Sequence, residues 1–89
     1  MNSHISEDFR KCLADLPKEV REKATKAFKQ FEMDPFNKSL QFKQVHPIKP
    51  IVSVRVTIQY RAVGVKEGDD ILWYWIGHHS EYERIIKNI

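Results

Sequence analysis

The chain has 89 residues and a net charge of +3, with 42% hydrophobic and 30% charged residues. This length allows one domain, residues 1–89, and the apolar content excludes an intrinsically disordered chain, which lacks the surface to form a core. One cysteine, Cys12, excludes an internal disulfide and a multi-thiolate metal cage, and no segment approaches the roughly 20 apolar residues that span a membrane. The first residues also lack the basic and apolar regions of a secretion signal, so we expect a cytoplasmic protein without a membrane partner.

Two amphipathic helices are predicted in the first third of the chain. Ser6 precedes two carboxylates and is a typical N-cap, so the first helix should run from there to about Asp15. Pro17 ends this helix and suits the first turn of a second one, which residues 34–35 close. Apolar residues recur at spacings of three and four, as Phe9, Cys12, Leu13 and Leu16 and then as Val20, Ala24, Ala27, Phe28 and Phe31. We expect the two helices to form an antiparallel hairpin.

After residue 35 the apolar period changes from about 3.6 to 2, which predicts β-strands. Apolar and polar residues alternate over 52–58, and a reversal near residues 58–59 leads into a second strand over 60–66. The polar turn at 67–70 leads into a third strand over 71–76, and these strands should form an antiparallel meander. Residues 40–45 are a candidate for an additional, earlier strand, which the prolines at 47 and 50 separate from the others.

The end of the third strand and the residues after it carry several expectations. Trp73 and Trp75 should share one face of the strand, because alternate residues point the same way. Gly77 should end the strand, and Ser80 should cap a short final helix that carries Tyr82 and two isoleucines. The predicted fold class is therefore α+β, with an N-terminal helical hairpin packed on an antiparallel β-sheet of three to four strands and a short C-terminal helix.

Positive charge is concentrated in the middle of the chain. Residues 36–66 contain no Asp or Glu, whereas they hold six cations, Lys38, Lys43, Lys49, Arg55, Arg61 and Lys66. A patch of one sign raises the local concentration of polyanions, and arginine binds phosphate through paired, planar donors. Nucleic acid is therefore the first partner to test.

Four residues form the predicted catalytic set. Arg55 and Arg61 lie on neighbouring strands and can present two permanent cations to one phosphate, while His79 and Tyr82 follow the third strand at its end. RNA cleavage without a metal needs a proton acceptor for the ribose 2′-hydroxyl, cations for the phosphate and an acid for the leaving oxygen. His78 and His79 should point to opposite faces because they are adjacent, and His79 is the better candidate for proton transfer.

Further residues supplement this set, and each has an ordinary structural explanation beside the functional one. Lys43, His46 and Lys49 are candidates for RNA or phosphate binding. Arg55 could instead be the solvated half of an alternating strand, and Tyr82 could pack its ring on the last helix. No Cys or His pair has the spacing of metal ligands and no glycine-rich phosphate loop is present, so neither a metal nor a cofactor is predicted.

These segments, in this order, resemble the RelE/ParE toxin superfamily of bacterial type II toxin–antitoxin pairs. The resemblance covers nearly the whole chain and is carried by the helical hairpin and by SVRV at 53–56, YRAV at 60–63, WIGHH at 75–79 and EYE at 81–83. It implies a compact sheet flanked by helices and a cognate antitoxin as partner. RelE-like members cut messenger RNA in the ribosomal A site and leave a 2′,3′-cyclic phosphate, whereas ParE-like members poison DNA gyrase.

The resemblance also implies roles for individual residues. Arg61 matches the arginine that follows an aromatic residue on the central strand and contacts the scissile phosphate. Arg55 lies close to where RelE has catalytic lysines, and His79 falls on the basic position after the glycine. Tyr82 resembles the tyrosine of the C-terminal segment, although its spacing from His79 is shorter than in RelE. The paired Lys-x-Lys of RelE is absent, so the general base is not identified.

The sequence thus predicts the toxin of a type II toxin–antitoxin system, acting as a ribosome-dependent, metal-independent endoribonuclease, an mRNA interferase, on messenger RNA and the ribosome. Two alternatives stay open. The first is a ParE-like, non-catalytic inhibitor of DNA gyrase, and the second is an inactive module that binds RNA or the antitoxin.

Overall fold

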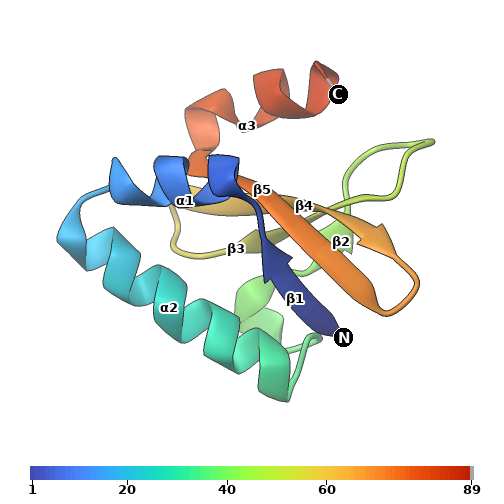
Figure 1. Cartoon of the computed structure of the whole chain (residues 1–89), viewed down its shortest axis with the longest axis horizontal. Helices are drawn as coiled ribbons and strands as arrows, with labels where there is room; N and C mark the ends of the chain where they lie inside the picture. Colours follow the sequence, from blue (N-terminus) through green and yellow to red (C-terminus); the bar gives the residue numbers. More distant parts are fainter. Residues whose placement is uncertain (89) are drawn as a thin grey trace.

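The computed structural model describes residues 1–88, and the predicted α+β class is confirmed. In chain order the elements are β1 (Asn2–Ile5), α1 (Glu7–Ala14), α2 (Lys18–Met33), the 3-10 turn η1 (Lys38–Leu40), β2 (Lys43–Gln44), β3 (Ile51–Arg55), β4 (Tyr60–Glu67), β5 (Asp70–His78) and α3 (His79–Lys87). Figure 1 shows α1 and α2 joined in a V, with α3 on its own at the end of β5. Among the described residues, no helix is long and apolar enough to cross a membrane.

The sheet has five strands, one more than the upper end of the predicted range. Its order is β1-β5-β4-β3-β2, and the pairs β2–β3, β3–β4 and β4–β5 are antiparallel as predicted. The added strand, β1, runs parallel to β5, with Asn2 opposite Asp70. A strand of four residues has too short a pattern to predict alone, and its partner lies near the other end of the chain. The candidate strand at 40–45 is reduced to Lys43 and Gln44.

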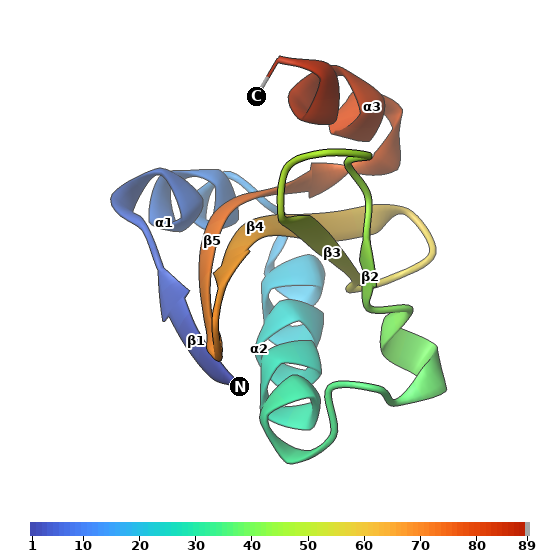
Figure 2. The same cartoon turned by 90° about the vertical axis from the view of Figure 1, so that its right-hand side faces the viewer.

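Two apolar clusters hold the helices to the two faces of the sheet. In Figure 2 the sheet curves, with α2 on one side and α3 on the other. The larger cluster joins α1 and α2 to the sheet and includes Phe9, Ala24, Ala27, Phe31, Leu40, Val52, Val54, Ala62, Ile71, Trp73 and Ile76. The smaller one contains Ile51, Val63 and Trp75, against which Tyr82 and Ile85 of α3 pack. Burial of these side chains is the main stabilising contribution, because it removes apolar surface from water.

A β-bulge separates the two tryptophans, so the prediction that they share one face is wrong. Val63 lies opposite Trp75, but Gly64 lies opposite Trp73, which leaves Tyr74 as an extra residue in β5. The inserted residue reverses the alternation, and Trp73 therefore belongs to the larger cluster while Trp75 belongs to the smaller one.

The junction of β5 with α3 differs from the prediction in three ways. Gly77 does not end the strand: it pairs with Arg61, and β5 continues to His78. The N-cap of α3 is His78 rather than Ser80, because the His78 Nδ1 accepts a hydrogen bond of 3.1 Å from the Ser80 backbone nitrogen. His79 is already helical, so the two histidine rings do not point to opposite faces; they stack with centroids 4.6 Å apart.

Candidate functional site

Three of the four predicted catalytic residues line one hollow. It lies where β4 begins and β5 passes into α3, and it has a volume of about 510 Å³. The residues that line it are Ile58, Arg61, His79, Ser80, Tyr82 and Glu83. The start of α3 is held against the β3–β4 turn because the His79 backbone nitrogen donates a 2.7 Å hydrogen bond to the Gln59 carbonyl. This contact brings the first residue of α3, His79, into the same hollow as Arg61, which is the second residue of β4.

The guanidinium of Arg61 is held by neutral groups. Its Nη2 donates a hydrogen bond of 3.0 Å to the Gln41 Oε1, and its Cζ lies 5.5 Å from the centroid of the Tyr82 ring. Its Nη1 is buried and has no hydrogen-bond partner among residues 1–88, and no carboxylate of those residues lies within 4 Å of the group. Arg61 therefore forms no ion pair with the described residues, although the carboxylate of Glu83 lines the same hollow.

Gln41 contributes to this arrangement, although no sequence pattern pointed to it. Its backbone lies in the left-handed region, with φ of 46°, which is uncommon for a residue other than glycine. This conformation ends η1 and precedes β2, and the Gln41 side chain reaches Arg61 across 20 residues of sequence. Strained backbone of this kind is often retained at functional sites.

Tyr82 is tied to the sheet by its hydroxyl group. The hydroxyl donates a hydrogen bond of 3.2 Å to the Oγ of Ser53, a residue of β3 that is fully buried. The aromatic ring meanwhile lies over the Arg61 guanidinium. In this arrangement Tyr82 connects α3 to β3 and contacts Arg61, and its hydroxyl is directed at the sheet.

His79 and Glu83 supply the exposed titratable groups of the hollow. They are four residues apart on α3, so both side chains lie on one face of the helix. Within the part of the chain that the structure describes, the His79 ring makes its contact by stacking on His78, and no hydrogen bond occupies its nitrogens. An imidazole and a carboxylate side by side can act as proton donor and acceptor. Glu83 had no predicted role, although it belongs to the EYE segment.

Arg55 and Arg61 are direct cross-strand partners in the β3–β4 pair. They nevertheless line different hollows. Arg55 contributes to a second hollow of about 280 Å³, between α2, η1 and the end of β3, together with Lys23 and Lys26. Arg55 therefore lies at the position expected along the strand, but it is not among the residues around His79.

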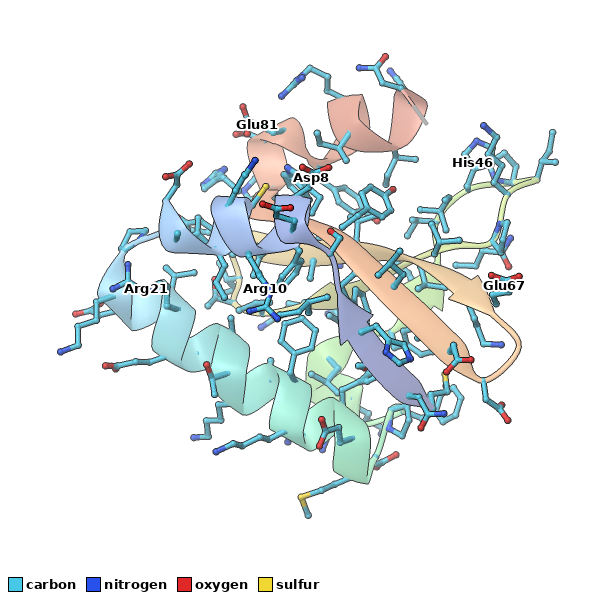
Figure 3. The ribbon with its side chains drawn as sticks, in the orientation of Figure 1. Asp8, Arg10, Arg21, His46, Glu67 and Glu81 are labelled. Atoms are coloured by element: carbon cyan, nitrogen blue, oxygen red, sulfur yellow. The ribbon has the colours of Figure 1, made fainter. Side chains whose placement is uncertain are left out.

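The three other predicted phosphate-binding residues lie outside the hollow of Arg61. Lys43 lines a neighbouring hollow of about 360 Å³ on the other side of Tyr82. His46 and Lys49 lie in the β2–β3 connection, before the first residue of β3, whereas Arg55 is its last residue. The two ends of β3 are roughly 13 Å apart along the extended strand. Figure 3 shows His46 in that loop, well apart from Glu81 at the start of α3. The His46 Nδ1 accepts hydrogen bonds of 3.1 and 2.9 Å from the backbone nitrogens of Ile48 and Lys49, which indicates a structural role in the turn.

The perturbed titratable groups lie away from this hollow. Burial raises the pKa of Tyr74 to about 12, and its hydroxyl has no hydrogen-bond partner among residues 1–88. Hydrogen bonds from His4 and then from Asn2 lower the pKa of Asp70, at the start of β5. Within the described residues, no group of three or more His, Cys, Asp or Glu side chains is arranged to hold a metal ion.

Comparison with known structures shows a shared fold. The toxin–antitoxin complex of RelB and RelE from Methanococcus jannaschii matches with a TM-score of 0.74 at 17% identity, over 92% of this chain and 96% of that one. The RelE–RelB complex from Pyrococcus horikoshii matches with a TM-score of 0.68 at 15% identity, over 86% and 92%. A YoeB/ParE toxin from Agrobacterium tumefaciens matches with a TM-score of 0.67 at 14% identity, over 89% and 99%. A search of curated protein sequences found no match.

The sequence also matches a family model, that of the ParE-like toxin domain, over residues 18–84. This region runs from the start of α2 into α3 and so includes every residue that lines the hollow around Arg61. Together, the family match and the shared fold establish that the chain belongs to the ParE-like toxin domain family, within the RelE/ParE toxin superfamily of toxin–antitoxin systems.

Proposed function

We propose that this toxin is a ribosome-dependent, metal-independent endoribonuclease that cleaves messenger RNA. The observation that carries the proposal is the state of Arg61, whose guanidinium is held by Gln41 and Tyr82 without a carboxylate within 4 Å among residues 1–88. A cation kept by neutral partners binds a phosphate without first breaking an ion pair. His79 and Glu83 line the same hollow and add the groups that move protons.

In the proposed reaction the ribose 2′-oxygen attacks the adjacent phosphorus and the bond from phosphorus to the 5′-oxygen breaks. The products are a 2′,3′-cyclic phosphate and a 5′-hydroxyl. Glu83 accepts the proton of the 2′-hydroxyl, His79 donates a proton to the leaving 5′-oxygen, and Arg61 stabilises the charge that develops on the phosphate oxygens. Tyr82 holds Arg61 in place through its ring, because its hydroxyl is already bonded to Ser53.

Dependence on the ribosome fits the open form of the hollow. His79 and Glu83 are exposed, and no lid formed by the described residues covers them. Such a site orients a flexible RNA strand poorly by itself, and correct orientation of reactants contributes a large part of many rate enhancements. The ribosome already restricts the motion of a bound messenger RNA, so less conformational entropy would be lost when the toxin orients the RNA for cleavage. The proposed target also places the protein in the cytoplasm.

The partner that we propose for the free toxin is a cognate antitoxin. The RelE proteins of Methanococcus jannaschii and Pyrococcus horikoshii, which share the fold, were solved as complexes with RelB antitoxins. Co-expression with the product of an adjacent small reading frame should yield a complex that co-purifies and should suppress the growth arrest that the free toxin causes. Independent purification of both proteins would contradict this part of the proposal.

A second candidate is a non-catalytic inhibitor of DNA gyrase. The observation that favours it is the family model itself, whose description is ParE-like. In that case the hollow around Arg61 would be a binding surface, and messenger RNA would stay intact after induction. Gyrase-dependent supercoiling of plasmid DNA would fall instead.

The deciding experiment is controlled expression in a bacterial host, followed by primer extension on messenger RNA. The unaltered chain should arrest growth and produce new 5′ ends of messenger RNA fragments at fixed positions within codons. Arg61→Ala should abolish both effects while its thermal unfolding stays cooperative, whereas Arg10→Ala, an exposed arginine on α1, should behave like the unaltered chain. Growth arrest with intact messenger RNA would contradict the nuclease and favour the gyrase inhibitor.

A further inference from the structure

The hollow that contains Arg55 is a second concentration of positive charge. Its cations, Lys23, Lys26 and Arg55, come from α2 and from the end of β3, and no carboxylate is among the residues that line it. We call it the lysine hollow. Its polar lining is completed by Gln30, Ser39 and Thr57; the Ser39 hydroxyl already donates to the Asn37 Oδ1, whereas the Gln30 amide and the Thr57 hydroxyl can donate hydrogen bonds.

The three cations are not neutralised by neighbouring groups. Glu19 and Glu22 precede the two lysines by four residues, a spacing that permits ion pairs on a helix, yet neither pair comes within 4 Å. Over residues 1–88, no hydrogen bond or ion pair holds the Arg55 guanidinium either. Three like charges around one hollow repel one another, and a bound anion would relieve that repulsion.

The lysine hollow adjoins the hollow around Arg61. Arg55 and Arg61 are opposite one another in the β3–β4 pair, where Cα atoms of partners are about 4.5–5.5 Å apart. The turn that follows β3 is shared as well, since Thr57 lines the lysine hollow and Ile58 lines the other. A third hollow lies between them, since Lys23, Thr57 and Ile58 also line it, so a strand of RNA that leaves the reaction site passes Glu83 and Glu19 on the way to Lys23 and Lys26.

We propose that the lysine hollow binds a second phosphate of the RNA strand whose reacting phosphate lies at Arg61. This inference rests on the proposed nuclease function and adds a subsite to it. Arg55 is then a binding residue of the second phosphate rather than a catalytic residue at the first.

The test measures binding of a short single-stranded RNA in which every ribose is 2′-O-methylated, so that it cannot be cleaved. The double variant Lys23→Gln and Lys26→Gln is compared with Lys18→Gln and Lys29→Gln, which removes the same charge from other exposed positions of α2. We expect affinity to fall roughly two- to fivefold more for each lysine of the hollow than for each control lysine. The dependence of log affinity on log salt should also become shallower by about 0.7 for each phosphate that the variant no longer neutralises. Arg55→Gln should give the same salt signature.

The outcomes separate this inference from the function on which it rests. The nuclease is judged by cleavage and by Arg61→Ala, whereas the second subsite is judged by the affinity for RNA that cannot be cut. Equal affinity and equal salt dependence in the two double variants would overturn the inference. A loss of affinity for the antitoxin alone, with RNA binding unchanged, would also overturn it and would assign the lysine hollow to an acidic segment of the protein partner.

Discussion

The ring of Tyr82 lies over the guanidinium of Arg61, 5.5 Å from its Cζ, while the hydroxyl of the same tyrosine bonds Ser53 on the adjacent strand. One side chain thus connects α3 to β3 and β4 at the centre of the proposed site. The hydrogen bond fixes the ring, and the ring fixes the arginine. The proposed phosphate-binding group therefore depends on the docking of the last helix.

The first prediction separates positioning by Tyr82 from proton transfer by its hydroxyl. Tyr82→Phe keeps the ring over Arg61 but removes the hydrogen bond to Ser53, so the free energy of unfolding should fall by about 1 kcal/mol. Growth arrest should persist, because the arginine is still covered. Tyr82→Ala should lose both stability and toxicity. Denaturant unfolding and induced growth arrest measure the two effects, and inactive but stable Tyr82→Phe would show that the hydroxyl takes part in the chemistry.

The second prediction concerns the two titratable groups of the hollow. His79→Asn and Glu83→Gln should each reduce the rate of messenger RNA cleavage on programmed ribosomes by about 100-fold or more, the usual contribution of general acid–base catalysis. Both residues are exposed, so thermal stability should change little. His4→Asn, on β1, is the matched control and should cleave at the normal rate. Full cleavage activity of both variants would contradict the proposal that His79 and Glu83 transfer protons in the reaction.

The third prediction tests the β-bulge that separates Trp73 from Trp75. A Cβ at Gly64 would lie 2.9 Å from the Leu72 carbonyl oxygen and from side-chain atoms of Ile71 and Trp73. Gly64→Ala should therefore destabilise the protein by about 2–3 kcal/mol, because a backbone oxygen in the β4–β5 ladder cannot move aside cheaply. Gly68→Ala has open space around it and should cost only about 1 kcal/mol, from its φ of 60°. Equal losses in denaturant unfolding would contradict the bulge geometry.

The fourth prediction follows from the raised pKa of Tyr74. Its pKa rises from 10.0 to about 12 on folding because the hydroxyl is buried, so between these values the unfolded chain has lost a proton that the folded chain keeps. Stability from this group is complete below pH 10 and is lost as the pH rises toward about 12. Tyr74→Phe should remove that loss. At neutral pH it should leave stability equal or higher, because the hydroxyl has no partner among residues 1–88.

Denaturant unfolding of the unaltered chain and of Tyr74→Phe at neutral pH and above pH 10 checks both statements. The difference between the two proteins isolates Tyr74 from the lysines that titrate in the same range. A constant difference across the range would show that the tyrosine titrates alike in both states.

Much of the fold could be predicted from local pattern. The apolar spacing of α1 and α2, the alternation in β3 and the polar turn before β5 are each properties of a few consecutive residues. The candidate site was predicted in part for the same reason: Arg61 lies at the start of one strand and His79 and Tyr82 follow the end of its neighbour, and the pattern places these two positions near one another. Gln41 and Ser53 were missed, because their contacts with Arg61 and Tyr82 join residues 20 and 29 positions apart.

The errors have specific physical causes. The alternation of side chains assumes a regular strand, and the insertion of Tyr74 reverses it, so Trp73 and Trp75 face opposite ways. Gly77 resembles a strand breaker in sequence, yet its lack of a Cβ lets the Trp75 ring lie against it, with ring carbon Cζ2 at 2.6 Å from where a Cβ would be. Extended geometry at His78 and His79 was the wrong assumption because the helix begins between them.

By itself, the sequence determined the helices, the antiparallel meander, the segregation of positive charge and the resemblance to the toxin superfamily. Each of these depends on the composition or on patterns among residues that are close in sequence. The tertiary structure alone decided that β1 completes the sheet, that Tyr82 covers Arg61, and that the cross-strand partners Arg55 and Arg61 line different hollows. These arrangements depend on register and on contacts between distant segments, which no local periodicity encodes.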